Sequence, residues 1–332
     1  MDKVRLGIIG CGGIMEDHVN GFVTMPDVEV VAVADLIAER REETAARFGT
    51  KLMYRDHTEL YNSLKPADLD AVFIAVPPSE HKGIEEEAIA RKWHFKVEKP
   101  MTLCQDQAHA ISKAALDAGI VTAVGFQDRY LDLTARMKEA LTSMRVGLVN
   151  GFWAGGIPMV PWWRTKATCG GQLLEQNIHL VDLLRYLFGD FASVYAVSGQ
   201  GVVDAEKDCP GYDLEDYSTA VFTMKSGVVA TLHSLCYLLS GGSALSNGLT
   251  IHGREQSIDY RLRNHVRFVS HGVEHCYHRL NNQITDSDRA FFDAVKKADP
   301  AGVRSPYADA LKTLDACFAA NQSMASGKPI VL

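Results

Sequence analysis

The sequence predicts an α/β protein whose first part is a doubly wound parallel sheet and whose second part is an α+β domain with a large, mainly antiparallel open sheet. Up to about residue 125, short apolar runs alternate with helical stretches, which is typical of a parallel sheet covered on both faces. After that residue, β-rich runs follow one another, as in antiparallel sheets. The 332 residues also exceed the roughly 250 to 300 that one core usually serves, so two domains are expected.

The chain opens with a strand, a glycine turn and the start of a helix. The apolar run at residues 4–9 (VRLGII) stops at the turn GCGG, residues 10–13. Gly10 permits the backbone angles of a tight turn, and Gly12 has no side chain to keep a pyrophosphate from the free N–H groups of the helix. The order of these elements is typical of a dinucleotide-binding Rossmann fold.

A strand-end carboxylate supports the same interpretation. The apolar run at 28–34 (VEVVAVA) ends in Asp35, 23 residues past Gly12, where a carboxylate would hydrogen-bond the hydroxyls of an adenosine ribose. Because Asp35 would repel a 2′-phosphate, NAD is expected rather than NADP, although Arg40 and Arg41 follow closely in the chain.

The remaining runs complete two domains, expected at 1–125 for the Rossmann domain and 126–332 for a substrate-binding and oligomerisation domain. About six parallel strands are expected in the first domain. Its further strands are predicted at 71–76, 94–97 and 121–124, and its further helices at 36–48, 80–91 and 106–118. The β-rich runs of the second domain are 147–153, 194–201, 216–224, 228–237, 250–253 and 256–260.

Composition narrows the class of protein. Apolar residues make up 47% and charged residues 23% of the chain, which is ordinary for a folded protein. The formal charge of −7 and the lack of a basic, aromatic stretch argue against nucleic acid as a partner. No apolar run reaches the roughly 18 residues of a membrane span. Seven cysteines without a CxxC pair favour reduced thiols and a cytoplasmic location.

Several segments, in this order and at these spacings, resemble the glucose–fructose oxidoreductase and inositol dehydrogenase family, Gfo/Idh/MocA. The matching segments are GIIGCGGIM at 7–15, Asp35, PPSEH at 77–81, VEKP at 97–100, GFQDRY at 125–130, GGQLLEQNIHLVDLLRYLFG at 170–189, and the final helix before SGKPIVL. The resemblance covers nearly the whole chain. It implies a nicotinamide cofactor on the first domain, a sugar, cyclitol or related polyol against the second, and a homodimer or homotetramer formed through the second sheet.

Lys99 is the first catalytic candidate. It follows a buried strand in the tripeptide Glu98-Lys99-Pro100, and ligands of doubly wound sheets bind at the carboxyl ends of the strands. An ammonium group there can hold a substrate oxygen and stabilise the negative charge that develops during hydride transfer. The Lys99-Pro100 bond is of the kind that can be cis.

The second catalytic pair is predicted on one helix over 172–188. On a regular helix, a wedge of about 80° collects Gln172, Glu175, His179, Asp182 and Tyr186, and leucine-rich sequence surrounds it. This narrow polar seam is expected to line a cleft. His179 can exchange a proton near neutral pH, and Glu175 precedes it by one turn. The resemblance assigns His179 the acid/base role beside Lys99, although this chain has Glu175 where the family more often has Asp, Asn177 where Gly is common, and Met15 where a small residue is usual.

The expected catalytic residues are Lys99, His179 and Glu175, and further residues are expected to bind the cofactor and the substrate. The expected cofactor-binding residues are Gly10, Gly12, Gly13, Ile14, Asp35, Pro77, His81, Glu98, Lys99 and Gln127. The expected substrate-binding residues are Lys99, Arg129, Trp163, Arg164, Glu175, His179 and Asp182. The stretch Trp162-Trp163-Arg164, with Lys166, suits sugar recognition and interdomain packing equally. His271, His275, Cys276 and His278 do not have the spacing of a zinc site, so no metal is expected.

The expected activity is NAD-dependent hydride transfer at a secondary alcohol or ketone of a sugar-like substrate. Three alternatives remain at this point. One is NAD-dependent glycoside cleavage without net NADH, and another is a non-catalytic sugar or NAD sensor, against which Lys99 and His179 argue. The third, a biliverdin-reductase-like activity, fits the polar helix less well.

Overall fold

A computed structural model describes residues 2–239 and 247–332, which fold as two compact units. Unit 1 comprises the chain up to Tyr130 together with Asn282–Leu311, and unit 2 comprises Leu131–Asn281 together with Lys312–Leu332. None of the helices in the described residues is long and apolar enough to span a membrane. All seven cysteines are free thiols.

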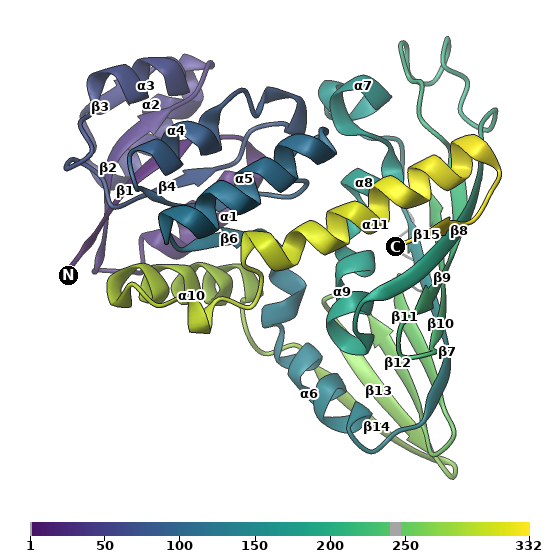
Figure 1. The fold of residues 1–332 in the computed structure, drawn as a ribbon. Helices are drawn as coiled ribbons and strands as arrows, with labels where there is room; N and C mark the ends of the chain where they lie inside the picture. The colour runs from purple at the N-terminus through teal and green to yellow at the C-terminus, as the bar shows by residue number, and fades with distance from the viewer. Residues whose placement is uncertain (1, 240–246) are drawn as a thin grey trace. The chain divides into compact units, whose positions relative to one another are not determined.

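Unit 1 is built on a parallel sheet of the expected kind (Figure 1). The order of its six described strands is β3-β2-β1-β4-β5-β6, so the strand order reverses between β1 and β4, where doubly wound sheets bind ligands. The strands are β1 (Val4–Ile9), β2 (Val28–Ala34), β3 (Leu52–Tyr54), β4 (Ala71–Ile74), β5 (His94–Val97) and β6 (Thr122–Val124). The helices are α1 (Gly13–Phe22), α2 (Ala38–Phe48), α3 (His57–Ser63), η1 (Pro78–Glu80), α4 (Ile84–Ala90), α5 (Gln105–Ala118), η2 (Gln127–Tyr130), α10 (Gln283–Lys297), η4 (Pro300–Gly302) and the start of α11 (Tyr307–Ser326).

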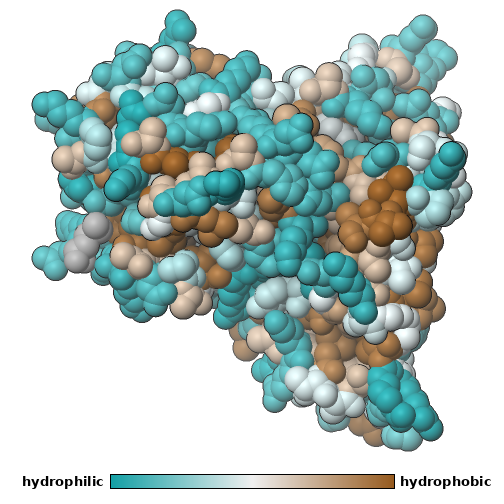
Figure 2. Space-filling model, viewed as in Figure 1, coloured by the Kyte–Doolittle hydropathy of each residue, from teal (hydrophilic) through white to brown (hydrophobic). Residues whose placement is uncertain are grey.

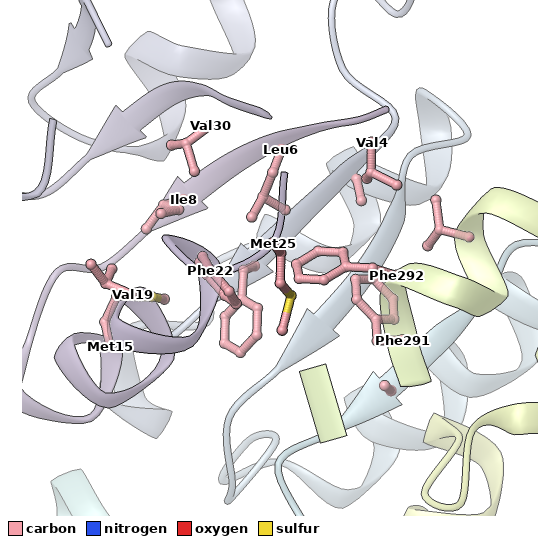
Figure 3. Close-up of a cluster of buried hydrophobic side chains, with 14 of the residues drawn as sticks. Val4, Leu6, Ile8, Met15, Val19, Phe22, Met25, Val30, Phe291 and Phe292 are labelled. Carbon is pink, nitrogen blue, oxygen red and sulfur yellow. The ribbon is translucent and has the colours of Figure 1, made fainter. Parts of the chain in front are cut away.

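The segment 282–311 returns to unit 1, unlike the boundary expected after residue 125. Phe291 and Phe292 of α10 are fully buried against α1 and the first strands, where Figure 3 shows them beside Phe22 and Met25. Outside this core, Asp27 accepts hydrogen bonds from Arg289 and Lys296 of α10. The apolar face of α10 is thus buried in unit 1. The sequence analysis instead expected this segment to belong to a single domain at 126–332.

Unit 2 contains the large open sheet. The order of its described strands is β14-β13-β12-β11-β7-β10-β9-β8-β15, and all neighbours are antiparallel except β7 and β10. The strands are β7 (Val146–Ala154), β8 (Phe191–Gly199), β9 (Tyr217–Met224), β10 (Val229–Leu235), β11 (Gly248–Gly253), β12 (Ser257–Arg261), β13 (His265–Ser270), β14 (Val273–His278) and β15 (Ile330–Val331). The helices are α6 (Asp132–Leu141), η3 (Pro161–Arg164), α7 (Lys166–Cys169), α8 (Gln172–Glu175), α9 (Ile178–Phe188) and the rest of α11.

One face of this sheet is buried and the other is open. Along β9, β10 and β12, buried residues alternate strictly with partly exposed ones, as expected when helices cover a single face. The space-filling view shows apolar residues at the surface around the strands of this unit (Figure 2). This open sheet face includes Leu148, Tyr195, Val197, Tyr217 and Val269, all between 37% and 48% exposed.

Candidate active site

The glycine turn of unit 1 has the geometry that a pyrophosphate group requires. Gly10 has a φ of +89°, and an added Cβ would lie 2.4 Å from the carbonyl oxygen of Ala75. At Gly12 and Gly13, by contrast, an added Cβ would meet nothing within 4 Å, so the N-terminus of α1 is open to a ligand. Ile14, in the first turn of α1, is 36% exposed. The turn therefore fits the phosphates of a dinucleotide.

Asp35 is held beside this turn by backbone groups. Its two carboxylate oxygens accept hydrogen bonds from the N–H of Cys11 and the N–H of Ile37, each at 2.7 Å. A carboxylate has about four acceptor positions, so ribose hydroxyls can still bind it. The Arg41 guanidinium, which follows Asp35 in the sequence, donates a hydrogen bond to the backbone carbonyl of Asp35 at 3.1 Å. This cation is therefore already bound to the backbone.

His81 lies just after η1 and is paired with an acid that the sequence analysis did not single out. Its Nδ1 is 2.5 Å from Oε1 of Glu85, and both side chains are buried. Burial lowers the pKa of His81, but the Glu85 carboxylate, together with the Val76 backbone and Glu86, raises it, and the net shift is upward. The spacing of four residues could have identified this pair. Pro77 precedes η1 and is partly buried.

Lys99 and Gln127 lie beyond the carboxyl ends of β5 and β6. Glu98 is buried and Lys99 is partly exposed, and the Lys99-Pro100 peptide bond is cis. The Oε1 atom of Gln127 is buried and has no hydrogen-bond partner among the residues that the structure describes. A buried acceptor of this kind fits the amide or hydroxyl donor of a bound ligand.

Arg129 has strong partners within unit 1. Its guanidinium is 2% exposed, and Nη1 donates to the carbonyl oxygen of Arg304 at 2.6 Å and to the Asp309 carboxylate at 2.5 Å. In return, Arg304 donates to the carbonyl oxygen of Arg129 at 2.8 Å. These contacts give Arg129 a structural role in joining η2 to the returning segment, and its expected part in substrate binding stays a prediction.

In unit 2 the single helix expected over 172–188 is wrong. The chain instead forms α8 and α9, because the backbone N–H groups of Gln176 and Asn177 both bond to the carbonyl of Gln172 and the regular ladder is interrupted there. Glu175 ends α8, and His179 lies in the first turn of α9. Residues on the two sides of this break do not follow the angles of one regular helix, so the wedge drawn for a continuous helix overstates their alignment.

Four of the five residues of the expected seam, Gln172, Glu175, His179 and Asp182, are buried, whereas Tyr186 is partly exposed. Glu175 is 2% exposed, His179 6% and Asp182 1%. Asp182 accepts a hydrogen bond from Thr313 of α11 at 2.8 Å, which explains part of its burial. Most of the expected seam is therefore enclosed by protein rather than lying on an ordinary solvated helix face.

Trp153 is a neighbour of His179 that the sequence analysis missed. It lies near the end of β7, and its ring is nearly parallel to the His179 imidazole, at 18° with 6.2 Å between centroids. Strand alternation puts Trp153 on the face opposite Phe152, but it does not reveal which helix a ring on that face will meet. The indole provides a flat apolar surface beside the proposed acid/base residue.

The loop before α8 is tied together by its own side chains. The Trp162 and Trp163 rings stack at 16°, and Arg164 donates to the carbonyl oxygens of Pro158 and Met159, both at 3.0 Å. Lys166 lies 3.7 Å from the buried carboxylate of Glu215. The Arg164 contacts brace the loop, so its part in substrate binding stays a prediction, as does that of Trp163.

The histidines near the end of unit 2 do not converge. His271 lies in the turn between β13 and β14, and His275, Cys276 and His278 lie exposed along β14. Adjacent residues of a strand point to opposite faces, so His275 and Cys276 point away from each other.

Comparison with known protein families matches both parts of the chain. Residues 4–126 match the model of an oxidoreductase family with an NAD-binding Rossmann fold, and residues 135–259 match the GFO/IDH/MocA C-terminal domain.

Similar proteins act on cyclitols and sugars. The scyllo-inositol 2-dehydrogenase (NAD(+)) of Bacillus subtilis is 29% identical over 60% of this chain, a segment that spans 57% of that enzyme. The levoglucosan dehydrogenase of Pseudarthrobacter phenanthrenivorans is 26% identical over 92% of this chain and 80% of its own length. A solved structure of levoglucosan dehydrogenase with NADH has the same fold, with a TM-score of 0.85, 20% identity and 99% of each chain covered. The two family matches together span most of the sequence, so this chain belongs to the GFO/IDH/MocA family of oxidoreductases, whose first domain is an NAD-binding Rossmann fold.

Proposed function

We propose that this chain is an NAD-dependent dehydrogenase or reductase that acts on a secondary alcohol, or the corresponding ketone, of a sugar or cyclitol. One observation of unit 1 carries the proposal. The glycine turn after β1, Asp35 after β2 and Lys99 after β5 all follow strands of one parallel sheet, so they share its carboxyl edge. An ammonium group thus lies on the edge that has a dinucleotide-binding turn.

The residues present divide the work of such a reaction. When bound, NAD supplies a nicotinamide ring that accepts or returns a hydride. Lys99 holds the substrate oxygen and stabilises the negative charge that forms on it. His179 takes the hydroxyl proton during oxidation and returns it during reduction. Glu175 orients one of these two groups, and Gly10, Gly12, Gly13 and Asp35 bind the phosphates and the adenosine ribose.

The substrate class follows from similar enzymes and from the residues of unit 2. The relatives named above act on an inositol and on levoglucosan. The flat ring of Trp153 beside His179 suits the C–H face of a six-membered ring that bears hydroxyl groups.

We also propose that the open sheet face is the contact surface of a homodimer or homotetramer, with a second copy of the chain as its occupant. Tyr195, Val197 and Tyr217 lie on neighbouring strands of this face and are 42%, 48% and 44% exposed. Light scattering at micromolar concentration should give at least twice the chain mass, and Val197→Glu should lower it by placing a charge among these residues. A monomeric wild-type protein would contradict this proposal.

The seven free thiols favour a reducing, cytoplasmic compartment.

Screening purified protein with NAD tests the activity directly. The panel consists of inositols, anhydrosugars, sugar acids and simple sugars, and NADH is followed by its absorbance. Formation of NADH with at least one compound supports the proposal. Cleavage of a glycoside without net NADH would reassign the chain to the glycosidase alternative, and NAD binding without any turnover would favour the sensor alternative.

A further inference from the structure

Four ionisable side chains of alternating charge form a buried chain of contacts in unit 1. Lys96 Nζ lies 2.7 Å from Asp288 Oδ1, Asp288 Oδ2 lies 2.8 Å from His18 Nδ1, and His18 Nε2 lies 3.2 Å from Glu98 Oε1. His18 lies on α1, Lys96 on β5, Glu98 directly after β5, and Asp288 on α10. Lys96 and Asp288 are fully buried, His18 is 2% exposed and Glu98 7%.

The two contacts of His18 fit an imidazolium that is protonated on both nitrogens. Each ring nitrogen faces a carboxylate oxygen, and an ionised carboxylate can only accept a hydrogen bond. The cluster then contains two cations, Lys96 and His18, and two anions, Asp288 and Glu98. The Ser287 hydroxyl also lies 2.7 Å from Lys96 Nζ, and the His18 ring packs beside the rings of Phe22 and Phe73. An imbalance of charge in a buried cluster of this kind is strongly destabilising, because it leaves an uncompensated buried charge.

This chain of contacts ends beside the proposed catalytic lysine. Glu98 immediately precedes Lys99, and its Oε2 accepts a hydrogen bond from the backbone N–H of Lys99 at 3.3 Å. The Glu98 carboxylate lies against Gly125, where an added Cβ would come within 2.0 Å of Oε1. Glu98 is thus fixed from one side by His18 and from the other by a backbone that has no room for a side chain.

We propose that His18, supported by Asp288 and Lys96, is a positioning residue that fixes the Glu98 side chain in place and thereby sets the position of Lys99 at the carboxyl end of β5. This inference rests on the proposed function of Lys99. Without the imidazolium, the Glu98 carboxylate loses its cationic hydrogen-bond partner, so it must bind another donor or move away from its place against Gly125. Either change alters the hydrogen bond that Glu98 accepts from the backbone of Lys99.

Two variants separate positioning from a general loss of stability. His18→Gln leaves one cation, Lys96, with two anions. The double variant His18→Gln/Asp288→Asn leaves one cation and one anion, which restores the balance. We expect both variants to lower kcat at least about tenfold with little change in the Kd for NAD, because neither has an imidazolium beside Glu98, and the double variant to recover stability rather than kcat. Asp70→Asn is the matched control, because it removes the partner of Arg5 on β1 from the same unit and should leave kcat unchanged.

The pH profile provides a readout that a merely structural residue would not move. The kcat of the wild-type protein should fall as the pH rises through the pKa of His18, which is raised to about 9, and this limb should be absent from the double variant. If His18→Gln does not fold, the comparison of wild type with the double variant still decides the question. A wild-type pH profile and kcat in either His18 variant would overturn the inference.

An independent measurement distinguishes failure of this inference from failure of the proposed function. Nitrogen-15 NMR of histidine-labelled protein should detect, near neutral pH, an imidazolium that is absent from the double variant. A neutral His18 would overturn the inference whatever the activity. Unchanged turnover in Lys99→Met would instead reject the proposed role of the lysine, even with His18 protonated.

Discussion

The charged cluster around His18 should make the stability of unit 1 fall at alkaline pH. Burial lowers the pKa of His18, but Asp288 and Glu98 raise it more, from the ordinary value of 6.5 to about 9. Because the pKa is higher in the folded than in the unfolded chain, this stabilisation is complete below about pH 6.5 and is lost as the pH rises through about 9. At about 1.4 kcal/mol per pKa unit, the loss amounts to about 3 kcal/mol.

Urea unfolding at a series of pH values measures this dependence. Between pH 6.5 and 9, the free energy of unfolding of the wild-type protein should decline by about 3 kcal/mol relative to that of His18→Gln/Asp288→Asn. The pKa of His81 is also raised, but His81 is present in both proteins, so its contribution cancels in the difference. Parallel curves for the two proteins over this range would refute the assignment of a buried imidazolium to His18.

Two further predictions concern the cofactor and the packing beside Lys99. Asp35→Ser should raise the catalytic efficiency with NADP, relative to NAD, at least about tenfold, because it removes a carboxylate that would repel a 2′-phosphate. Steady-state kinetics with both cofactors measures this ratio. Comparable efficiencies with NAD and NADP in the wild-type protein would contradict the role of Asp35. Gly125→Ala should lower the free energy of unfolding by about 1 to 3 kcal/mol, because the new Cβ overlaps the Glu98 carboxylate. Gly147→Ala, where an added Cβ meets nothing within 4 Å, is its control, and equal stability of the two variants would contradict the packing argument.

Elements with strong local patterns could be predicted from the sequence. The apolar runs that became β1, β2, β4 and β5 are buried in a parallel sheet, and the glycine turn lies where the pattern predicted it. Short or exposed strands have no such pattern. β3 has three residues, none of them buried, and β14 is exposed throughout; neither was foreseen.

Features that depend on distant residues could not be predicted in the same way. The His18 cluster joins residues 18, 98 and 288, and no local spacing announces such contacts. The stacking of Trp153 on His179 likewise requires knowledge of which helix covers the end of β7. The break between α8 and α9 was missed because its sequence has neither proline nor glycine, the usual signals of a helix end.

Turnover and NAD binding, measured together for Lys99→Met and His179→Asn, test the central claim most directly. With a substrate found by the NADH screen, each variant should retain NAD binding and lose about a hundredfold or more in turnover, the usual scale for a positioned acid/base or electrostatic group. The pH profile of His179→Asn should also flatten near neutrality, whereas Lys99→Met should weaken substrate binding as well as the rate. Unchanged turnover in either variant would contradict the role assigned to that residue, and loss of NAD affinity in both would assign them to cofactor binding instead.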